Sequence, residues 1–157
     1  EKPNGHSKIG YVPQSTNLLD DTIIKNITFC DEKQNDKEFL INVAKQAQIR
    51  DLIENFGNKK IGERGLRMSG GQLQRLSIAR ALYKKPSIII FDEATSALDD
   101  KTELKVINSI FNLDQNITIL IIAHRLSTLK NCSQLIELED CKVLRSGSYN
   151  EIVNKKY

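Results

Sequence analysis

The chain has no tryptophan, a single methionine and three cysteines among its 157 residues. Cys30, Cys132 and Cys141 are far apart and form no CxxC pair, and the only histidines are His6 and His124. A structural zinc site is therefore not expected. The odd number of separated cysteines favours free thiols in a reducing compartment over a disulfide framework.

Long apolar runs are also absent: no segment approaches the eighteen or so residues that a membrane-spanning helix requires. The first five residues are polar and do not include an initiator methionine, and no secretory signal follows them. We therefore expect the chain to be a piece of a longer polypeptide.

Charge is balanced, with 23 basic against 20 acidic residues and a net charge of +3. The basic residues occur in short runs such as Lys59-Lys60 and Lys84-Lys85, not in a stripe or a tail. This distribution argues against a nucleic-acid partner. The length is sufficient for one domain with a hydrophobic core.

Helical spacing of apolar residues predicts four helices in the first half of the chain, over 22–29, 36–47, 49–56 and 71–85. Asp36 is expected to cap the second helix and Gly57 to end the third. Before these helices, residues 8–12 read as a short strand stopped by Pro13. The span 15–85 holds no predicted strand, so we interpret it as an all-helical insertion.

Two uniformly apolar segments, 87–92 and 117–122, read as parallel strands covered on both faces. The helix predicted between them, 100–112, is expected to turn Leu104, Ile107 and Phe111 inward. A terminal strand pair, 134–139 and 142–145, precedes a helix with a capping box in Ser148 and Glu151. The order of elements predicts an α/β fold with a parallel sheet.

Two adjacent carboxylates, Asp92 and Glu93, end the first apolar strand. Ligands of open parallel sheets gather at the carboxyl ends of strands. An aspartate there can hold Mg²⁺ beside phosphate, and the next carboxylate can activate water. The alternative is that Asp92 only caps a turn.

Polar side chains follow two more strands at the same predicted edge. His124 follows the second apolar strand, where it can contact a terminal phosphate, although a packed or capping histidine is the alternative. Gln14 follows the first strand of the chain, where its amide oxygen can reach the same metal. A solvated loop glutamine is the alternative for Gln14.

Ser69-Gly70-Gly71-Gln72 opens the fourth helix. Exposed N–H groups at a helix N-terminus favour anions, glycines let a phosphate approach the backbone, and the serine hydroxyl adds a donor. The alternative is a helix cap with a flexible entry.

A phosphate-binding loop of the form G-x-x-x-x-G-K-[ST] is missing from the chain. The pairs Gly57/Gly62 and Gly65/Gly70 have the right separation, but neither is followed by the lysine and hydroxyl. Both pairs are therefore rejected, and the chain has no phosphate-binding loop of its own.

Taken in order, these motifs resemble the nucleotide-binding domain of ABC transporters. The segment 68–72 resembles the signature motif, with Met68 where leucine is usual; Gln14 falls on the Q-loop and His124 on the switch histidine. Asp92 falls at the end of Walker B, Glu93 on the catalytic glutamate, and Asp99 on the D-loop.

The resemblance implies a P-loop NTPase (RecA-like) parallel sheet core with an all-helical insertion subdomain, from which the N-terminal part with the Walker A loop is missing. On this interpretation residues 1–14 and 86–157 belong to the core. Residues 15–85 form the helical subdomain with the signature motif.

Roles follow from the same resemblance. Glu93 is the expected catalytic base, Asp92 and Gln14 serve Mg²⁺, and His124 contacts the γ-phosphate. The family works as a head-to-tail dimer, so the signature of one subunit is expected to bind the ATP of the other, with Asp99 communicating across the interface. The signature residues given this role are Ser69, Gly70, Gly71 and Gln72.

Two segments resemble the exporter type of the family: Gly62-Glu63-Arg64-Gly65, before the signature, and 21–27, after the Q-loop. The resemblance implies an ATPase that drives export of a substrate. Because the Walker A loop is missing, we expect the chain alone to bind ATP weakly and to show little or no ATPase activity. Its implied partners are a second nucleotide-binding domain, identical or different, and a transmembrane domain that precedes this segment. The ATPase would then lie at the cytoplasmic face of a membrane.

Two alternatives stay open. One is a non-transport ABC ATPase of DNA repair or translation, which would need coiled coils or a second nucleotide domain elsewhere in its gene. The other is a short regulatory module without Walker A that docks on a partner's nucleotide site.

Overall fold

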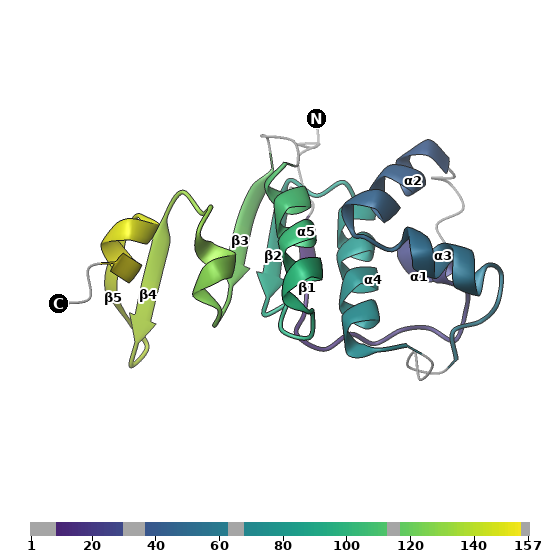
Figure 1. Cartoon of the computed structure of the whole chain (residues 1–157), viewed down its shortest axis with the longest axis horizontal. Coiled ribbons are helices and arrows are strands. Elements are labelled where there is room, and N and C mark those ends of the chain that lie inside the picture. The colour runs from purple at the N-terminus through teal and green to yellow at the C-terminus, as the bar shows by residue number, and fades with distance from the viewer. Residues whose placement is uncertain (1–8, 30–36, 63–67, 113–116, 155–157) are drawn as a thin grey trace, which may run out of the picture. The chain divides into compact units, whose positions relative to one another are not determined.

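The structure is a computed structural model that describes residues 9–29, 37–62, 68–112 and 117–154 (Figure 1). The chain divides into two compact units, residues 1–122 and 123–157.

The first unit contains a three-stranded parallel sheet in the order β1-β2-β3. Its strands are β1 (Ile9–Val12), β2 (Ile88–Asp92) and β3 (Thr118–Ile122). Tyr11 of β1 aligns with Ile90 of β2, and Ile90 aligns with Leu120 of β3. The predicted parallel sheet is confirmed, and the three strands end at one common edge.

The two faces of this sheet differ. Val12, Ile89 and Phe91 lie on one face and are buried in the core. The opposite face carries Tyr11 and Leu120, each 52% exposed. The prediction that the second apolar strand is covered on both faces is therefore wrong for β3, because the described residues pack against only one of its faces.

Helices occupy the segment between β1 and β2 in Figure 1: α1 (Ile23–Thr28), α2 (Lys37–Gln46), α3 (Arg50–Phe56) and α4 (Gly70–Tyr83). Thr22 caps α1 by accepting a hydrogen bond from the Lys25 N–H, and Gly57, with φ 53°, ends α3. The four predicted helices are confirmed, and no strand occurs in the described part of 15–85. The predicted cap Asp36 lies outside the described residues.

Helix α5 (Asp100–Phe111) connects β2 to β3. Ile107 is buried as predicted, but Leu104 is 57% exposed, so the prediction that it faces inward is wrong. The inward position belongs instead to Glu103, which is 5% exposed and accepts a hydrogen bond of 2.9 Å from the buried Thr95 hydroxyl. That bond lets a carboxylate occupy a core position that sequence patterning assigns to an apolar residue.

The second unit contains the short 3₁₀ helix η3 (Leu126–Leu129) and an antiparallel hairpin of β4 (Leu135–Glu139) and β5 (Lys142–Gly147). The hairpin turns at Asp140, as predicted. The last helix, η4 (Asn150–Asn154), follows a capping box in which the Ser148 N–H donates to Glu151 over 2.8 Å.

Among the described residues, Cys132 and Cys141 are free thiols, and burial raises the pKa of Cys132. None of the helices described combines the length and the apolar character that crossing a membrane demands.

Candidate functional site

The carboxyl ends of β1 and β2 bring polar side chains together. Gln14, just beyond β1, donates from its amide nitrogen to the Glu93 carboxylate over 2.7 Å. Asp92 is the last residue of β2 and accepts a hydrogen bond of 2.7 Å from the Tyr11 hydroxyl. Residues 79 to 81 positions apart in the chain thus meet at one edge of the sheet.

Glu93 adopts a left-handed backbone conformation, with φ 49°. A non-glycine residue in this region costs on the order of 1–3 kcal/mol and persists only where its surroundings impose it. Two backbone hydrogen bonds do so: the Glu93 N–H donates to Ile122 over 2.9 Å, and its carbonyl accepts from Ser96 over 3.1 Å. The chain therefore turns sharply at Glu93.

Tyr11 was not among the residues singled out from the sequence. Donation to Asp92 raises the pKa of its hydroxyl, with desolvation and the negative charge of Asp92 as smaller causes. The tyrosine therefore stays protonated and holds one carboxylate oxygen of Asp92. The available signal was the position of Tyr11 in the first strand. Side chains alternate between the two faces of a strand, so Tyr11 lies on the same face as Asp92 once the strand register is known.

These residues suit a magnesium ion that is shared with phosphate and water. No group of three or more carboxylate, histidine or cysteine side chains that could hold a metal by itself occurs among the described residues. What the edge offers is oxygen: two carboxylates, and the amide oxygen of Gln14, since its nitrogen faces Glu93. Hard oxygen ligands, few in number, fit Mg²⁺, which usually keeps several waters.

Ser69 and Gln72 form a capping box at the start of α4. The Ser69 hydroxyl accepts from the Gln72 N–H over 3.3 Å, and the Gln72 side-chain oxygen accepts from the Ser69 N–H over 2.8 Å. The helix-cap interpretation is thus realised in the chain. It leaves the hydroxyl hydrogen and the Gln72 side-chain nitrogen as donors, together with the first N–H groups of α4.

The two glycines of this motif pack closely against the segment after Glu93. A Cβ atom on Gly71 would lie 3.1 Å from the Ala97 carbonyl oxygen, and one on Gly70 would lie 3.3 Å from the Ala97 Cβ. Close approach of protein backbone is therefore a reason for glycine here, in addition to the phosphate approach expected from the sequence.

Gln74, one helical turn inside α4, is a residue that sequence reasoning missed. Its side chain is buried, donates to the Ser96 hydroxyl over 3.1 Å and accepts from the Ala97 N–H over 3.0 Å. An amide among the apolar residues of α4 was the available signal. Gln74 therefore fixes α4, the helix that begins in the signature segment, to the turn that follows Glu93.

Asp99 caps α5: its carboxylate accepts from the Thr102 N–H over 3.0 Å. Hydrogen bonding to the Thr102 side chain, and to a smaller extent to its N–H, holds the pKa of Asp99 below its ordinary value. The predicted communication across a dimer interface stays a prediction, and the cap is the role that the structure itself contains.

His124 follows β3 by two residues and is exposed. It falls in the second compact unit, whereas Gln14, Asp92 and Glu93 belong to the first. A contact between His124 and a terminal phosphate therefore stays a prediction.

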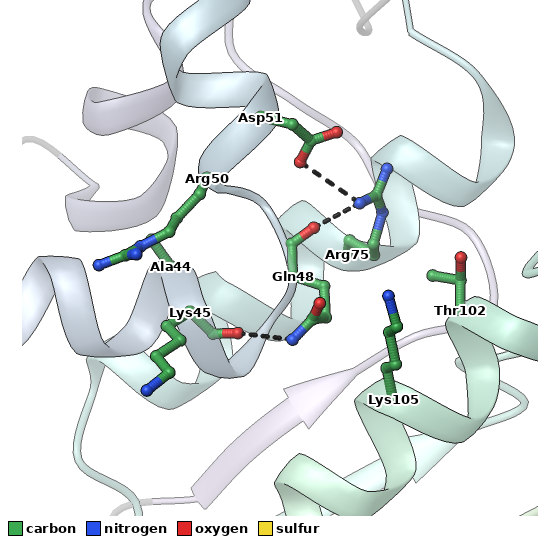
Figure 2. Close-up of a pocket in the computed structure, with 8 residues that line it drawn as sticks. All are labelled: Ala44, Lys45, Gln48, Arg50, Asp51, Arg75, Thr102 and Lys105. Carbon is green, nitrogen blue, oxygen red and sulfur yellow. Dashed lines mark hydrogen bonds and ion pairs between the residues drawn. The ribbon is translucent and has the colours of Figure 1, made fainter.

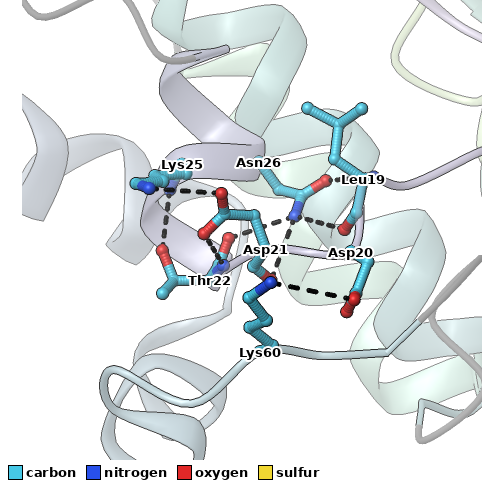
Figure 3. Close-up of polar contacts among 7 residues, drawn as sticks. All are labelled: Leu19, Asp20, Asp21, Thr22, Lys25, Asn26 and Lys60. Atoms are coloured by element: carbon cyan, nitrogen blue, oxygen red, sulfur yellow. Dashed lines mark hydrogen bonds and ion pairs between the residues drawn. The ribbon is translucent and has the colours of Figure 1, made fainter.

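A polar network joins the segment after Gln14 to α4. The fully buried Asn26 side chain accepts from the Leu19 N–H over 2.9 Å and donates to the Leu19 carbonyl over 3.0 Å (Figure 3). Arg80 of α4 donates to the Asn26 carbonyl, to its side-chain oxygen and to the Asn17 carbonyl, each over 3.0 Å. Burial lowers the pKa of this guanidinium.

The start of α1 is held by Asp21 (Figure 3). Its carboxylate accepts from the Thr22 N–H over 2.7 Å and pairs with Lys25 over 3.2 Å. The hydrogen bond to Thr22 is the largest cause of a lowered Asp21 pKa. Of the other exporter-like segment, 62–65, the residues Glu63, Arg64 and Gly65 lie outside the described residues.

Comparisons with known proteins identify the family. The family model described as ABC transporter matches residues 1–96. Over 152 residues the chain is 42% identical to "ABC transporter B family member 24, mitochondrial" of Arabidopsis thaliana, covering 95% of the chain and 22% of the relative. It is 37% identical over 155 residues to "ATP-dependent lipid A-core flippase" of Francisella tularensis, covering 97% of the chain and 26% of the relative.

A solved structure, "Structure of a bacterial Atm1-family ABC exporter with ATP bound", superposes with a TM-score of 0.88 at 35% identity, over 96% of the chain and 27% of that protein. The chain belongs to the ABC transporter family, and its fold is that of the family's P-loop ATPase domain, as predicted. The chain spans about a quarter or less of the length of the curated relatives compared above.

Proposed function

We propose that the chain is the part of an exporter's ATP-binding and hydrolysing domain that carries the catalytic carboxylate and the signature motif. The observation that carries this proposal is the sharp turn at Glu93, whose carboxylate is held by Gln14 at the carboxyl end of a parallel sheet. In the domain division we propose, 1–14 and 86–157 belong to the RecA-like core and 15–85 to the helical subdomain.

Glu93 is the general base of the proposed reaction. Its left-handed backbone turns the residue out of the line of β2, and Gln14 holds the carboxylate that would accept a proton from an attacking water. His124 is assigned to the γ-phosphate of the substrate ATP.

Asp92 and Gln14 are the residues assigned to magnesium. Mg²⁺, when bound, would neutralise the developing charge of the phosphates. Tyr11 keeps the Asp92 carboxylate oriented, because it donates to one of the two oxygens and leaves the second available.

The signature segment is assigned to ATP bound by a second nucleotide-binding domain in a head-to-tail dimer. The capping box leaves donors over at the start of α4, and a phosphate is an anion that such a helix N-terminus favours. Asp99, on the turn that packs against the signature glycines, is assigned to communication across that interface. The residues that we assign to ATP in this way are Ser69, Gly70, Gly71 and Gln72.

Coupling to a transmembrane domain is proposed to run through the Asn26–Arg80 network. A shift of Gln14 displaces Asn17 and Leu19, which are hydrogen-bonded to Arg80 and Asn26. The segment after Gln14 and the signature helix would therefore move together. We place the domain at the cytoplasmic face of a membrane, and its exported substrate is decided by membrane helices outside this chain.

Glu93→Gln in the complete transporter that carries this chain tests the proposal. Glutamine keeps the size of the side chain and an oxygen for Gln14, but it cannot accept a proton. Steady-state phosphate release should fall by at least about 100-fold, while equilibrium dialysis should show unchanged ATP binding. Glu139→Gln, an exposed carboxylate on β4, serves as the control and should hydrolyse ATP normally. Undiminished hydrolysis by the Glu93→Gln transporter would remove Glu93 from this role.

A further inference from the structure

A pocket of about 360 Å³ lies between the α2–α3 junction and α5, and no residue of the proposed ATP or magnesium site lines it (Figure 2). Its lining includes four basic residues, Lys45, Arg50, Arg75 and Lys105, against the single carboxylate of Asp51. The pocket therefore carries an excess of three positive charges, four basic less one acidic.

Arg75 is the least exposed of these four basic residues, with 16% of its side chain exposed. One guanidinium nitrogen donates to the Gln48 carbonyl and lies 3.5 Å from the Asp51 carboxylate. The Arg75 Nε is buried and has no hydrogen-bond partner among the described residues. A buried donor without an acceptor is costly, and an anion is a ligand that can satisfy it.

Lys105 and Thr102 reach the pocket from α5. Figure 2 shows the Lys105 ammonium pointing toward the space between Gln48, Arg75 and Thr102. No ion pair joins Lys105 to another residue that the structure describes. Thr102 lies in the first turn of α5, so its hydroxyl is near the positive end of a twelve-residue helix.

The wall opposite α5 is held in place by the turn between α2 and α3. Gln48 has φ 55°, and its side-chain nitrogen donates to the Lys45 carbonyl over 3.0 Å. The Gln48 backbone carbonyl accepts a hydrogen bond from Arg75. Lys45 and Arg50 extend away from Arg75 in Figure 2, so they add charge at the margin rather than contacts at the centre.

We propose that this pocket binds a compact oxyanion, namely phosphate or the phosphoryl group of a phosphate ester. The positive excess excludes a cation, and the few polar groups at the centre match an oxyanion with several acceptor oxygens. A bound oxyanion would connect Arg75 of α4 to Lys105 of α5. These are the two helices whose N-termini carry the signature motif and Asp99, so the anion would restrict their relative motion.

The test follows backbone amide shifts of the 157-residue chain by NMR. Sodium phosphate and, separately, glycerol 3-phosphate are titrated at constant ionic strength set with sodium chloride. We expect saturable shifts confined to residues 44–51, 75 and 102–105. A response to phosphate alone identifies the free ion as the ligand, and an equal response to the ester identifies the phosphoryl group; either result supports the site.

Three variants carry different expectations for the affinity of the oxyanion. Lys105→Gln should weaken binding about fivefold, the size expected for one ionic contact near the surface. Asp51→Asn, which frees Arg75 from its carboxylate, should tighten binding instead. Lys101→Gln, an exposed lysine on the same helix outside the pocket, should change nothing. Absence of saturable shifts, or equal affinities for the Lys105→Gln and Lys101→Gln chains, would overturn the proposal.

Discussion

Glu93 combines an unfavourable backbone conformation with the position proposed for the catalytic base. Its φ of 49° would suit glycine, yet the proposed reaction needs a carboxylate there, and Gln14 donates a hydrogen bond to that carboxylate. Strain of this kind gathers at functional sites, where the surrounding structure imposes a geometry that chemistry requires. On the proposed role of Glu93, the strain of this turn serves catalysis rather than stability.

Replacing Glu93 with glycine should therefore stabilise the fold. Glycine adopts positive φ without strain, and its greater freedom in the unfolded chain offsets part of the gain, so we expect the free energy of unfolding to rise by about 0.5–1 kcal/mol. Urea unfolding of the chain measures the change. Glu93→Gln retains the strain and should stay within about 0.5 kcal/mol of the parent. A Glu93→Gly chain less stable than Glu93→Gln would contradict the argument.

Single residues also show where sequence reasoning stops. Gln14, Asp92 and Glu93 could be selected because each lies at or just beyond the end of a predicted strand, and parallel strands share an edge. Tyr11 and Gln74 could not, since their partners Asp92 and Ala97 are identified only by the strand register and by the packing of α4. Long-range hydrogen bonds leave no periodic pattern in a sequence.

Among the helices and strands, the connection between α1 and α4 depends on one buried amide. Asn26→Ala would leave the Leu19 N–H and one Arg80 nitrogen without their acceptor in the core. We expect a loss of about 2–4 kcal/mol in the free energy of unfolding, since several buried donors lose partners together. Asn42→Ala on the exposed face of α2 is the matched control and should change stability by less than about 0.5 kcal/mol. Equal effects of the two substitutions would show that the network does not stabilise the fold.

The N-terminus of α5 should respond to acid through Asp99. The pKa of Asp99 is lower in the folded chain than its unfolded value of about 3.9. The ionised carboxylate therefore stabilises the fold above about pH 3.9, and this stabilisation is lost as the pH falls through the folded-state pKa. Asp99→Asn keeps a capping side chain without the charge. The stability difference between the parent and Asp99→Asn should therefore be fully present at about pH 7 and become smaller as the pH falls from about 3.9 toward about 3. A difference that stays constant over this range in urea unfolding would contradict the assignment.

Hydrophobic periodicity was sufficient for the positions of these elements but not for every face. It located α5, yet it assigned Leu104 inward because it cannot foresee that Glu103 finds a buried hydroxyl partner in Thr95. It also read β3 as buried on both faces. Composition shows that a strand is apolar, but it does not show which of its faces another layer covers.

In the molecule as a whole, the sheet of the first unit leaves an apolar face open among the described residues, formed by Ile9, Tyr11, Leu120 and Ile122. Exposed apolar patches of this kind mark surfaces that other protein normally covers. The family and its motif order were predicted from the sequence, because the motifs are local. The placement of the second unit, and with it His124, lies beyond what either motif or periodicity supplies.

ATP-dependent association tests the central claim, that the signature helix completes the ATP site of a second domain. The complete nucleotide-binding domain containing this chain would carry Glu93→Gln to prevent hydrolysis, and sedimentation velocity would follow its mass with magnesium and ATP. We predict an ATP-induced dimer that Ser69→Arg abolishes without loss of ATP binding, whereas Ser133→Arg, an exposed serine in the second unit, leaves it intact. A Ser69→Arg domain that dimerises with ATP as well as its parent would contradict the account.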